Sequence, residues 1–251
     1  MRSYRSFSGP EEAAHVLAKE LKTLSLTREE SHVVLSGGST PRLWFEILAQ
    51  PPYSQAIRWQ NLHFWWGDER CVAPADKESN YGEAKRILFD HIAIPAAHIH
   101  PIRGENEPEK EAERLSAEIV ALVPRMEMAA GQRSLPVFDW ILLGMGADGH
   151  TASLFPQETD FNEERLAVVA RHPQTGQARI SLSALQLASC KRLSFLVLGA
   201  DKAERVSEIF SHPAESLPYP AARITALHGP TEWLLDAASA SKLPDTASAL
   251  D

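Results

Sequence analysis

The chain has 251 residues, of which 44% are hydrophobic and 23% are charged, and its formal net charge is -8. This composition is that of a folded globular protein with a sizeable core, and it excludes wholesale disorder. The acidic balance argues against a nucleic-acid-binding protein, and it requires any anion site to be built locally from a few cations and backbone N–H groups.

The chain carries no sign of export or membrane insertion. Its first residues, MRSYRSF, lack the apolar run of a signal peptide, and no stretch approaches the length of a membrane span. Two cysteines, Cys71 and Cys190, lie far apart, and neither belongs to a Cys-x-x-Cys motif of a zinc or redox site. These features predict a reducing, cytoplasmic compartment.

The first elements expected along the chain are a helix, a short strand and a second helix. A capping box and apolar residues at helical spacing predict a helix over residues 8–26. An apolar strand over 32–35 then leads into the Gly-rich turn 36–40. Pro41 favours the start of a helix at this point, with Thr40 as its N-cap.

The alternation of strands and helices continues to the end of the chain. Strands are predicted at Leu62–Trp66, Phe138–Leu143 and Leu193–Leu198, and helices at Asn80–Ile92, Pro108–Val123 and from about Ala203. Uninterrupted apolar strands are typical of strands buried on both faces. The sequence therefore predicts an α/β fold with a mostly parallel sheet and helices on both faces, in which ligands bind at the carboxyl ends of the strands.

We expect a single domain over residues 1–251, because no internal repeat, low-complexity tract or obvious linker divides the chain. The tail from about Ala237 is small and polar, which predicts that it frays.

The Gly-rich turn 36–40 is the first candidate site. A tight turn at the start of a helix exposes backbone N–H groups that bind anions, and the hydroxyls of Ser39 and Thr40 can add hydrogen bonds. It is not a Walker loop, because the Gly-Lys-Ser/Thr ending is missing. A plain turn followed by a helix cap accounts for the same residues equally well.

Charged residues also follow two of the predicted strands. Asp68 and Arg70 come directly after one strand, and Lys202 follows another at the start of a helix, where it can contact a phosphate. Arg179 can add a second positive charge. Each of these residues by itself also fits an ordinary solvated loop.

Asp148 and His150 form the most informative pair. The glycines of 144–149 match the dinucleotide fingerprint, but they lie past the middle of the chain, and Pro156 follows too soon for a long phosphate-facing helix. The carboxylate of Asp148, two residues before His150, can orient the imidazole as a general base near neutral pH. A histidine that caps or packs is the common alternative.

The other histidines and the tryptophans suggest no site. The spacing of His98 and His100 fits no standard metal site, so no metal is expected there. The tryptophans are expected in the core rather than on a stacking platform, because no basic residues are interleaved with them; they include Trp44, Trp59, Trp65 and Trp66.

Three blocks of the sequence, in this order, resemble the 6-phosphogluconolactonase family. They are Leu35–Pro41, Trp66–Arg70 followed by Ser79–Tyr81, and Gly144–Pro156. The third block is the most specific, because the related glucosamine-6-phosphate deaminases keep Asp-Gly-His here without the Thr-Ala-Ser-Leu-Phe-Pro continuation. The resemblance covers nearly the whole chain.

The resemblance implies a Rossmann-like α/β fold, shared with those deaminases and with ribose-5-phosphate isomerases. It also implies a carboxylic ester hydrolase that converts 6-phosphogluconolactone to 6-phosphogluconate in the pentose phosphate pathway, without metal, nucleotide or other cofactor. Carried over by position, His150 is the base, and Asp68 and Arg70 line the reaction centre. The carboxylate that orients His150 is left open by the sequence, with Asp148 the candidate from its spacing.

The resemblance further implies a phosphate site made of Gly37, Gly38, Ser39, Thr40, Arg179 and Lys202. Residues 174–177 lack the Pro/Lys-rich stretch of the family, which makes Arg179 the least secure of these assignments. The expected partner is a small phosphorylated sugar lactone, with no nucleic acid or membrane, and the protein is expected to be a monomer or a small homo-oligomer.

Two other functions remain open. An amino-sugar-phosphate deaminase or sugar-phosphate isomerase needs proton shuttling between adjacent carbons, and the block at 66–70 disfavours it. A non-catalytic sugar-phosphate sensor would carry a DNA-binding helix pair. The chain is expected instead to begin with one helix and then enter the sheet.

Overall fold

The computed structural model describes residues 2–27, 30–126, 134–244 and 247–249. Its larger sheet has eight strands, and every pairing within it is parallel. Across the sheet the strands are β11 (Ser248–Ala249), β1 (Ser3–Phe7), β10 (Thr231–Asp236), β9 (Leu193–Val197), β6 (Trp140–Leu143), β2 (Ser31–Leu35), β3 (Leu62–Trp66) and β5 (Ile99–His100).

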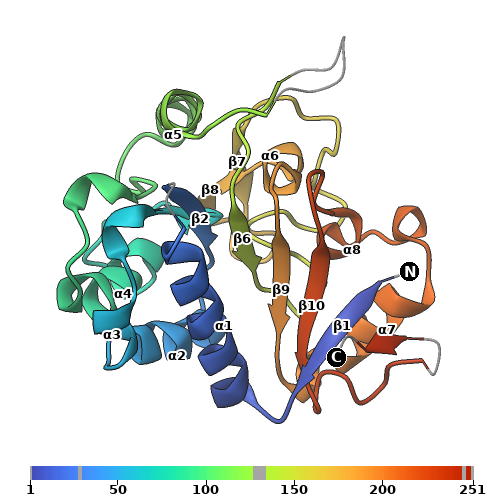
Figure 1. The fold of residues 1–251 in the computed structure, drawn as a ribbon. Coiled ribbons are helices and arrows are strands. Elements are labelled where there is room, and N and C mark those ends of the chain that lie inside the picture. Colours follow the sequence, from blue (N-terminus) through green and yellow to red (C-terminus); the bar gives the residue numbers. More distant parts are fainter. Residues whose placement is uncertain (1, 28–29, 127–133, 245–246, 250–251) are drawn as a thin grey trace.

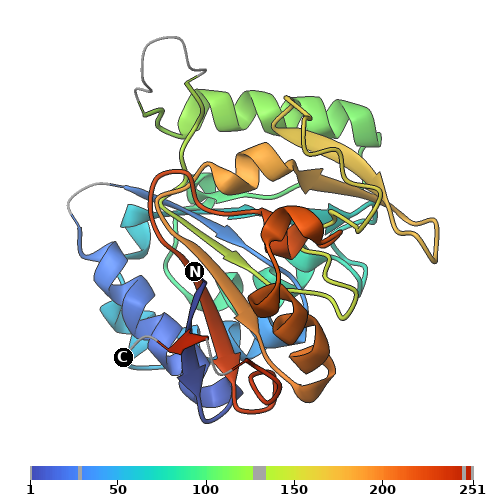
Figure 2. The ribbon, with the colours of Figure 1, turned by 90° about the vertical axis from the view of Figure 1, so that its right-hand side faces the viewer.

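Helices cover both faces of this sheet (Figures 1 and 2). One face carries α1 (Pro10–Ser25), α2 (Ser39–Leu48), α3 (Tyr53–Ala56) and α4 (Asn80–Ile87), and the other carries α6 (Ala184–Ala188), α7 (Ala203–Ser211) and α8 (Pro220–Arg223). The predicted α/β fold with a mostly parallel, doubly covered sheet is confirmed.

A second, antiparallel sheet was not predicted. Its strands are β4 (Asp68–Arg70), β8 (Ala178–Leu182) and β7 (Ala167–Arg171), and α5 (Pro108–Leu122) packs against β7 and β8. A single residue separates the end of β3 from the start of β4. The chain therefore passes directly from the large sheet into the small one, and the small sheet lies beside the carboxyl end of β3.

The predicted helices lie where they were expected, but some of them start or end at other residues than predicted. The helix expected over 8–26 is α1, and Ser8 hydrogen-bonds through its backbone N and its Oγ to the Glu12 carboxylate, both at 2.7 Å, rather than to Glu11. Thr40 is not the N-cap of α2, because Gly38 occupies that position. The helix expected to reach Ile92 ends five residues earlier.

The early end of α4 has a simple cause. After Ile87 the backbone tightens into a short 3₁₀ turn at Phe89–His91. Apolar residues three and four positions apart face one side of either kind of turn, so their spacing does not show where an α-helix stops.

Strands β1 and β11, at one side of the large sheet, were missed because distant residues hold them. The chain begins with β1, not with a helix, and β1 lies between β10 and β11. Arg5 of β1 pairs with Glu20 at 2.7 Å and with Glu232 at 3.5 Å. The tail expected to fray includes Ser239, whose Oγ donates to the Val197 carbonyl, and the two-residue strand β11. Composition carries no information on any of these long-range bonds.

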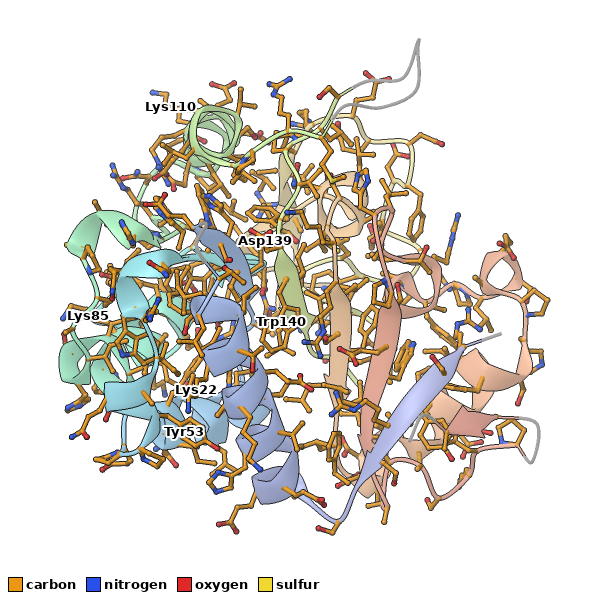
Figure 3. All side chains as sticks on the ribbon, in the orientation of Figure 1. Lys22, Tyr53, Lys85, Lys110, Asp139 and Trp140 are labelled. Atoms are coloured by element: carbon orange, nitrogen blue, oxygen red, sulfur yellow. The ribbon has the colours of Figure 1, made fainter. Side chains whose placement is uncertain are left out.

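The core lies between the large sheet and its helices. Trp44, Trp59, Trp65 and Trp66 are all at most 2% exposed, which confirms that they are core residues. Trp140 lies at the centre of the molecule, whereas Lys85 and Lys110 lie at its periphery (Figure 3). Within the described residues, the helices are too short or too polar to span a membrane.

Candidate active site

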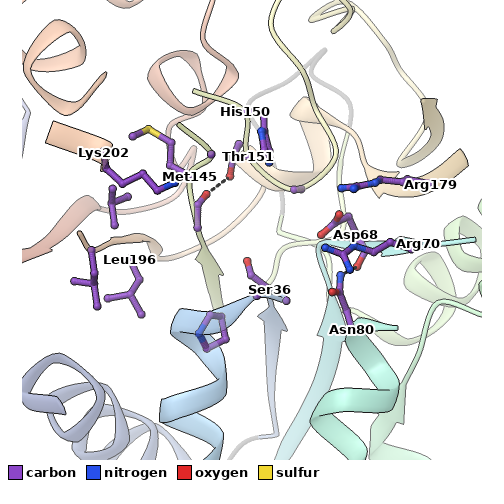
Figure 4. Close-up of a pocket in the computed structure, with 18 residues that line it drawn as sticks. Ser36, Asp68, Arg70, Asn80, Met145, His150, Thr151, Arg179, Leu196 and Lys202 are labelled. Carbon is purple, nitrogen blue, oxygen red and sulfur yellow. Dashed lines mark hydrogen bonds between the residues drawn. The ribbon is translucent and has the colours of Figure 1, made fainter. Parts of the chain in front are cut away.

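A cavity of about 240 Å³ opens at the carboxyl ends of the strands of the large sheet, beside β4 and β8 (Figure 4). It brings together predicted residues from separate parts of the sequence, namely Gly37, Gly38, Asp68, Arg70, His150, Arg179 and Lys202. Asp148 does not line the cavity but contacts His150. The side chains of Ser39 and Thr40 lie outside the part of the chain that the structure describes.

Asp148 orients the imidazole of His150. Its Oδ1 lies 2.6 Å from His150 Nδ1 and also accepts the His150 backbone N–H at 3.1 Å. Partial burial opposes ionisation of this carboxyl, but the facing imidazole and the backbone N–H still hold the pKa of Asp148 below its usual value. An ionised carboxylate only accepts, so a neutral His150 carries its proton on Nδ1, and its Nε2 has a free lone pair.

Two glycines make this contact possible. Gly149 has a φ of 85°, in the left-handed region, and the turn there brings His150 back to Asp148. A Cβ on Gly146 would lie 2.2 Å from both Cε1 and Nδ1 of His150 and 2.6 Å from Asp148 Oδ1. The backbone at Gly146 thus passes so close to the pair that no side chain fits there.

Buried hydrogen bonds fix Asp68 and the strand that carries it. Asp68 Oδ2 accepts a hydrogen bond from Ser153 Oγ at 2.6 Å. The next residue, Glu69, is 1% exposed and accepts the backbone N–H groups of Arg70, Asn80 and Tyr81. Burial raises the pKa of Glu69 to about 7 against the pull of these donors. Glu69 therefore ties β4 to the start of α4 instead of facing the cavity.

Arg70 and Arg179 lie directly opposite each other on the ladder between β4 and β8. Like charges in such a pair repel, and the Nε atom of each is buried without a hydrogen-bond partner among the described residues. Burial lowers the pKa of Arg179, an effect that the Asp68 charge opposes and the Arg70 charge adds to. Both guanidiniums border the cavity (Figure 4), so this wall suits an anion.

A second cationic wall faces the arginine pair across the cavity. Lys202 approaches from the other side in Figure 4, and its Nζ pairs with Asp201 at 2.9 Å. At the same cavity, α2 begins at Ser39, and its N-cap is Gly38, which has no side chain to cap the first N–H groups. The start of a helix with uncapped N–H groups attracts anions.

Three supporting residues were missed by sequence reasoning. Ser153, which holds Asp68, and Asn80, which lines the cavity and donates to the Asp68 carbonyl, both belong to blocks that the resemblance used. Asp236 at the end of β10 accepts the Gly199 N–H at 3.1 Å and so holds the turn that carries Lys202. No sequence pattern links Asp236 to that turn.

The departure of residues 174–177 from the family pattern does not move Arg179. These residues form the turn between β7 and β8, and Arg179 lies beyond it, in register with Arg70. Among the described residues, one group of three His, Cys, Asp or Glu side chains has ligand atoms close enough to hold a metal ion, and none of its members lines this cavity.

Comparisons with known proteins show the family of this chain. The family described as glucosamine-6-phosphate isomerases/6-phosphogluconolactonase matches residues 9–233. The chain is 53% identical to the 6-phosphogluconolactonase of Aggregatibacter actinomycetemcomitans over 241 residues, which cover 96% of this chain and all of the relative.

Solved structures are similar over nearly the whole chain. The crystal structure of devB protein has a TM-score of 0.92 and 52% identity, and the match covers 97% of this chain and all of that one. The 6-phosphogluconolactonase of Trypanosoma brucei has a TM-score of 0.85 and 26% identity, over 97% of this chain and 99% of that one.

Proposed function

The chain belongs to the family of glucosamine-6-phosphate isomerases and 6-phosphogluconolactonases, and from this premise we propose that it hydrolyses 6-phospho-D-glucono-1,5-lactone to 6-phospho-D-gluconate. This reaction belongs to the oxidative branch of the pentose phosphate pathway. Relatives with about half of their residues identical are named 6-phosphogluconolactonase, which supports a carboxylic ester hydrolase. The observation that carries the proposal is the His150–Asp148 pair beside two cationic walls of one cavity.

Hydrolysis of a δ-lactone needs a base, a place for the developing negative charge and an acid. His150 Nε2 takes a proton from the attacking water while the water oxygen forms a bond to the carbonyl carbon. Asp148 holds the ring and stabilises the imidazolium. Arg70 lies where a guanidinium can stabilise the oxyanion.

The tetrahedral intermediate then collapses. The bond from the carbonyl carbon to the ring oxygen breaks, and the imidazolium of His150 returns its proton to that oxygen. The product is a carboxylic acid, which loses its proton to water at neutral pH. Asp68, fixed by Ser153, borders the same end of the cavity as Arg70 and orients the substrate or the water.

We assign the phosphate group of the substrate to a site formed by the start of α2 and Lys202. Arg179 of β8 adds a further positive charge to this site. Contacts at this end position the carbonyl near His150, so binding energy far from the reacting bond contributes to catalysis. We also propose a cytoplasmic location, because Cys71 and Cys190 are free thiols.

The deaminase or isomerase alternative is less well supported. The same family includes such enzymes, but the relatives from Aggregatibacter actinomycetemcomitans and Haemophilus influenzae, at 53% and 52% identity, are both named 6-phosphogluconolactonase. A sugar-phosphate sensor would use the two cationic walls, but it would have no need for a carboxylate that fixes the tautomer of His150.

The experiment that tests the function follows acid release from freshly made 6-phosphogluconolactone, with the spontaneous rate subtracted. We expect a rate proportional to protein concentration and inhibition by inorganic phosphate. Glucosamine 6-phosphate serves as the competing substrate, with ammonia release as the readout. No rate above the spontaneous one, or turnover of the amino sugar alone, would contradict the proposal.

A further inference from the structure

Four histidines gather at the amino ends of β2, β3 and β5, at the edge of the large sheet opposite the cavity. The His63 ring stacks on His98 with 3.9 Å between centroids and on His32 with 4.6 Å. His100 stacks on Trp65 at 4.0 Å. His63 lies near the start of β3, whereas Asp68 begins β4 just beyond the other end of β3, roughly 15 Å further along the chain at the usual rise per residue. This histidine cluster is therefore separate from the proposed active site.

A chain of hydrogen bonds links His63 to a carboxylate. His63 Nδ1 lies 3.0 Å from His100 Nε2, and His100 Nδ1 lies 2.8 Å from Glu118 Oε1. Arg114 pairs with Glu118 on its other side. In the tautomer in which His100 donates from Nδ1 to Glu118 and accepts at Nε2, His63 donates from Nδ1 and offers the lone pair of Nε2 as a ligand.

Two further polar groups lie beside His63 Nε2. Glu30 Oε2 is 3.2 Å away, a distance that fits a hydrogen bond from Nε2–H and that two ligands of one metal ion also show. The His98 ring belongs to the same group, and its Nδ1 is buried without a hydrogen-bond partner among the described residues.

We propose that Glu30, His63 and His98 bind a zinc ion. Two imidazole nitrogens and one carboxylate oxygen are ligands that Zn²⁺ takes in proteins, with a fourth position for water. In a tetrahedron with bonds of about 2.1 Å, neighbouring ligand atoms lie about 3.4 Å apart. The His63 and Glu30 atoms are 3.2 Å apart, which is close to this spacing, and all three ligand atoms lie within 4.8 Å of one another.

The His98 ring must turn out of its stack on His63 to complete the site, because the nitrogen lone pairs of two parallel rings do not converge on one ion. The Glu30 side chain is 62% exposed, and His98 lies on the short turn Ala96–His98, so both side chains have room to move. The rest of the ligand environment is already present. His63 is hydrogen-bonded to His100, and His100 is hydrogen-bonded to Glu118; proteins orient metal-binding histidines through such imidazole-to-carboxylate chains.

The ion has a structural role in this position. It joins the residue before β2, the start of β3 and the turn before β5, which is an edge strand of only two residues. The spacing of His98 and His100 had indicated no metal site. The ligand set becomes visible only once the parallel register places His63 beside these loops.

Zinc binding by purified, chelator-treated protein tests the proposal. Titration calorimetry with Zn²⁺ should show one site, and Co²⁺ should show the visible absorption of a four-coordinate ion. Glu30→Gln and His98→Gln change residues at the protein surface, so both variants should fold. Each substitution should weaken Zn²⁺ binding by at least 10–100-fold. Loss of a residue that only hydrogen-bonds to a metal ligand already has an effect of this size.

Two controls separate this site from adventitious binding. His91→Gln removes an exposed histidine from a neighbouring turn and should leave the affinity unchanged. His150→Gln should also keep the site, since the cavity is at the other edge of the sheet. Lactone turnover should be unchanged in Glu30→Gln and His98→Gln.

Three results would overturn the proposal. The first is wild-type protein that binds Zn²⁺ no better than a surface histidine does. The second is unchanged affinity in both Glu30→Gln and His98→Gln. The third is loss of binding in His150→Gln alone, which would place the ion in the cavity.

Discussion

The two ends of β2 and β3 carry opposite kinds of polar cluster. At the carboxyl ends, Arg70, Arg179 and Lys202 surround a cavity that also borders the start of α2, where Gly38 is the N-cap. At the amino ends, stacked histidines and glutamates share hydrogen bonds. Helices of a parallel α/β fold begin at the first edge and end at the second, so their dipoles favour anions at the first and cations at the second. The carboxyl edge is thus suited to a phosphorylated substrate and the amino edge to a metal ion.

The largest effect should come from His150→Ala. Loss of a general base typically costs about 10²–10⁴-fold in turnover, while binding at the phosphate end should survive because Lys202 and the α2 start are untouched. The measurement is turnover above the spontaneous rate, with phosphate inhibition as the readout for binding. Zinc affinity at the other edge should not change. Near-normal turnover in the variant would refute the proposed mechanism.

The second effect should come from Gly146→Ala. The new methyl group would overlap the His150 ring and push it away from Asp148. A displacement of about 1 Å at a reacting group costs on the order of 10²-fold in rate. Gly67→Ala is the matched control, because its Cβ would meet nothing nearer than 3.5 Å. Equal rates in the two variants would mean that the close approach at Gly146 does not matter.

A smaller effect should come from Lys202→Ala. It removes a charged contact to the phosphate, of a kind worth about 1.5–3 kcal/mol, so KM should rise by roughly 10–100-fold with a smaller change in kcat. Inorganic phosphate should inhibit this variant less than the wild type. Lys242→Ala removes an exposed lysine paired with Glu204 and serves as the control. Unchanged phosphate inhibition in Lys202→Ala would place the phosphate elsewhere.

Removal of metal ions by a chelator should have the smallest effect on catalysis, and it distinguishes the two edges of the large sheet. Lactone turnover should be unchanged, whereas the melting temperature of the protein should fall. An ion present at 100 times its dissociation constant stabilises the folded state by about 2.7 kcal/mol, which is several degrees for a chain of this size. Chelated protein that loses turnover, with zinc restoring it, would contradict the separation of the two edges.

Local patterns predicted a large part of this protein. The pair Asp148 and His150 lies within one turn, so its contact depends on two neighbouring glycines rather than on the rest of the fold. Strand β3 was predicted with its observed ends, because a continuous apolar run buried on both faces needs no knowledge of its partners. The α/β class follows from the order of such elements.

Only the tertiary structure decided the contacts between distant segments. Arg70 meets Arg179 through the register of β4 and β8, and Ser153 reaches Asp68 across 85 positions of sequence. Glu30, His63 and His98 share no motif, and parallel pairing at one sheet edge brings them together. Apolar periodicity records which face of an element is buried, but it carries no information on which strand lies beside it or in which register. The residues of a turn are therefore readable from the sequence, whereas the partners across a sheet depend on the packing of the whole chain.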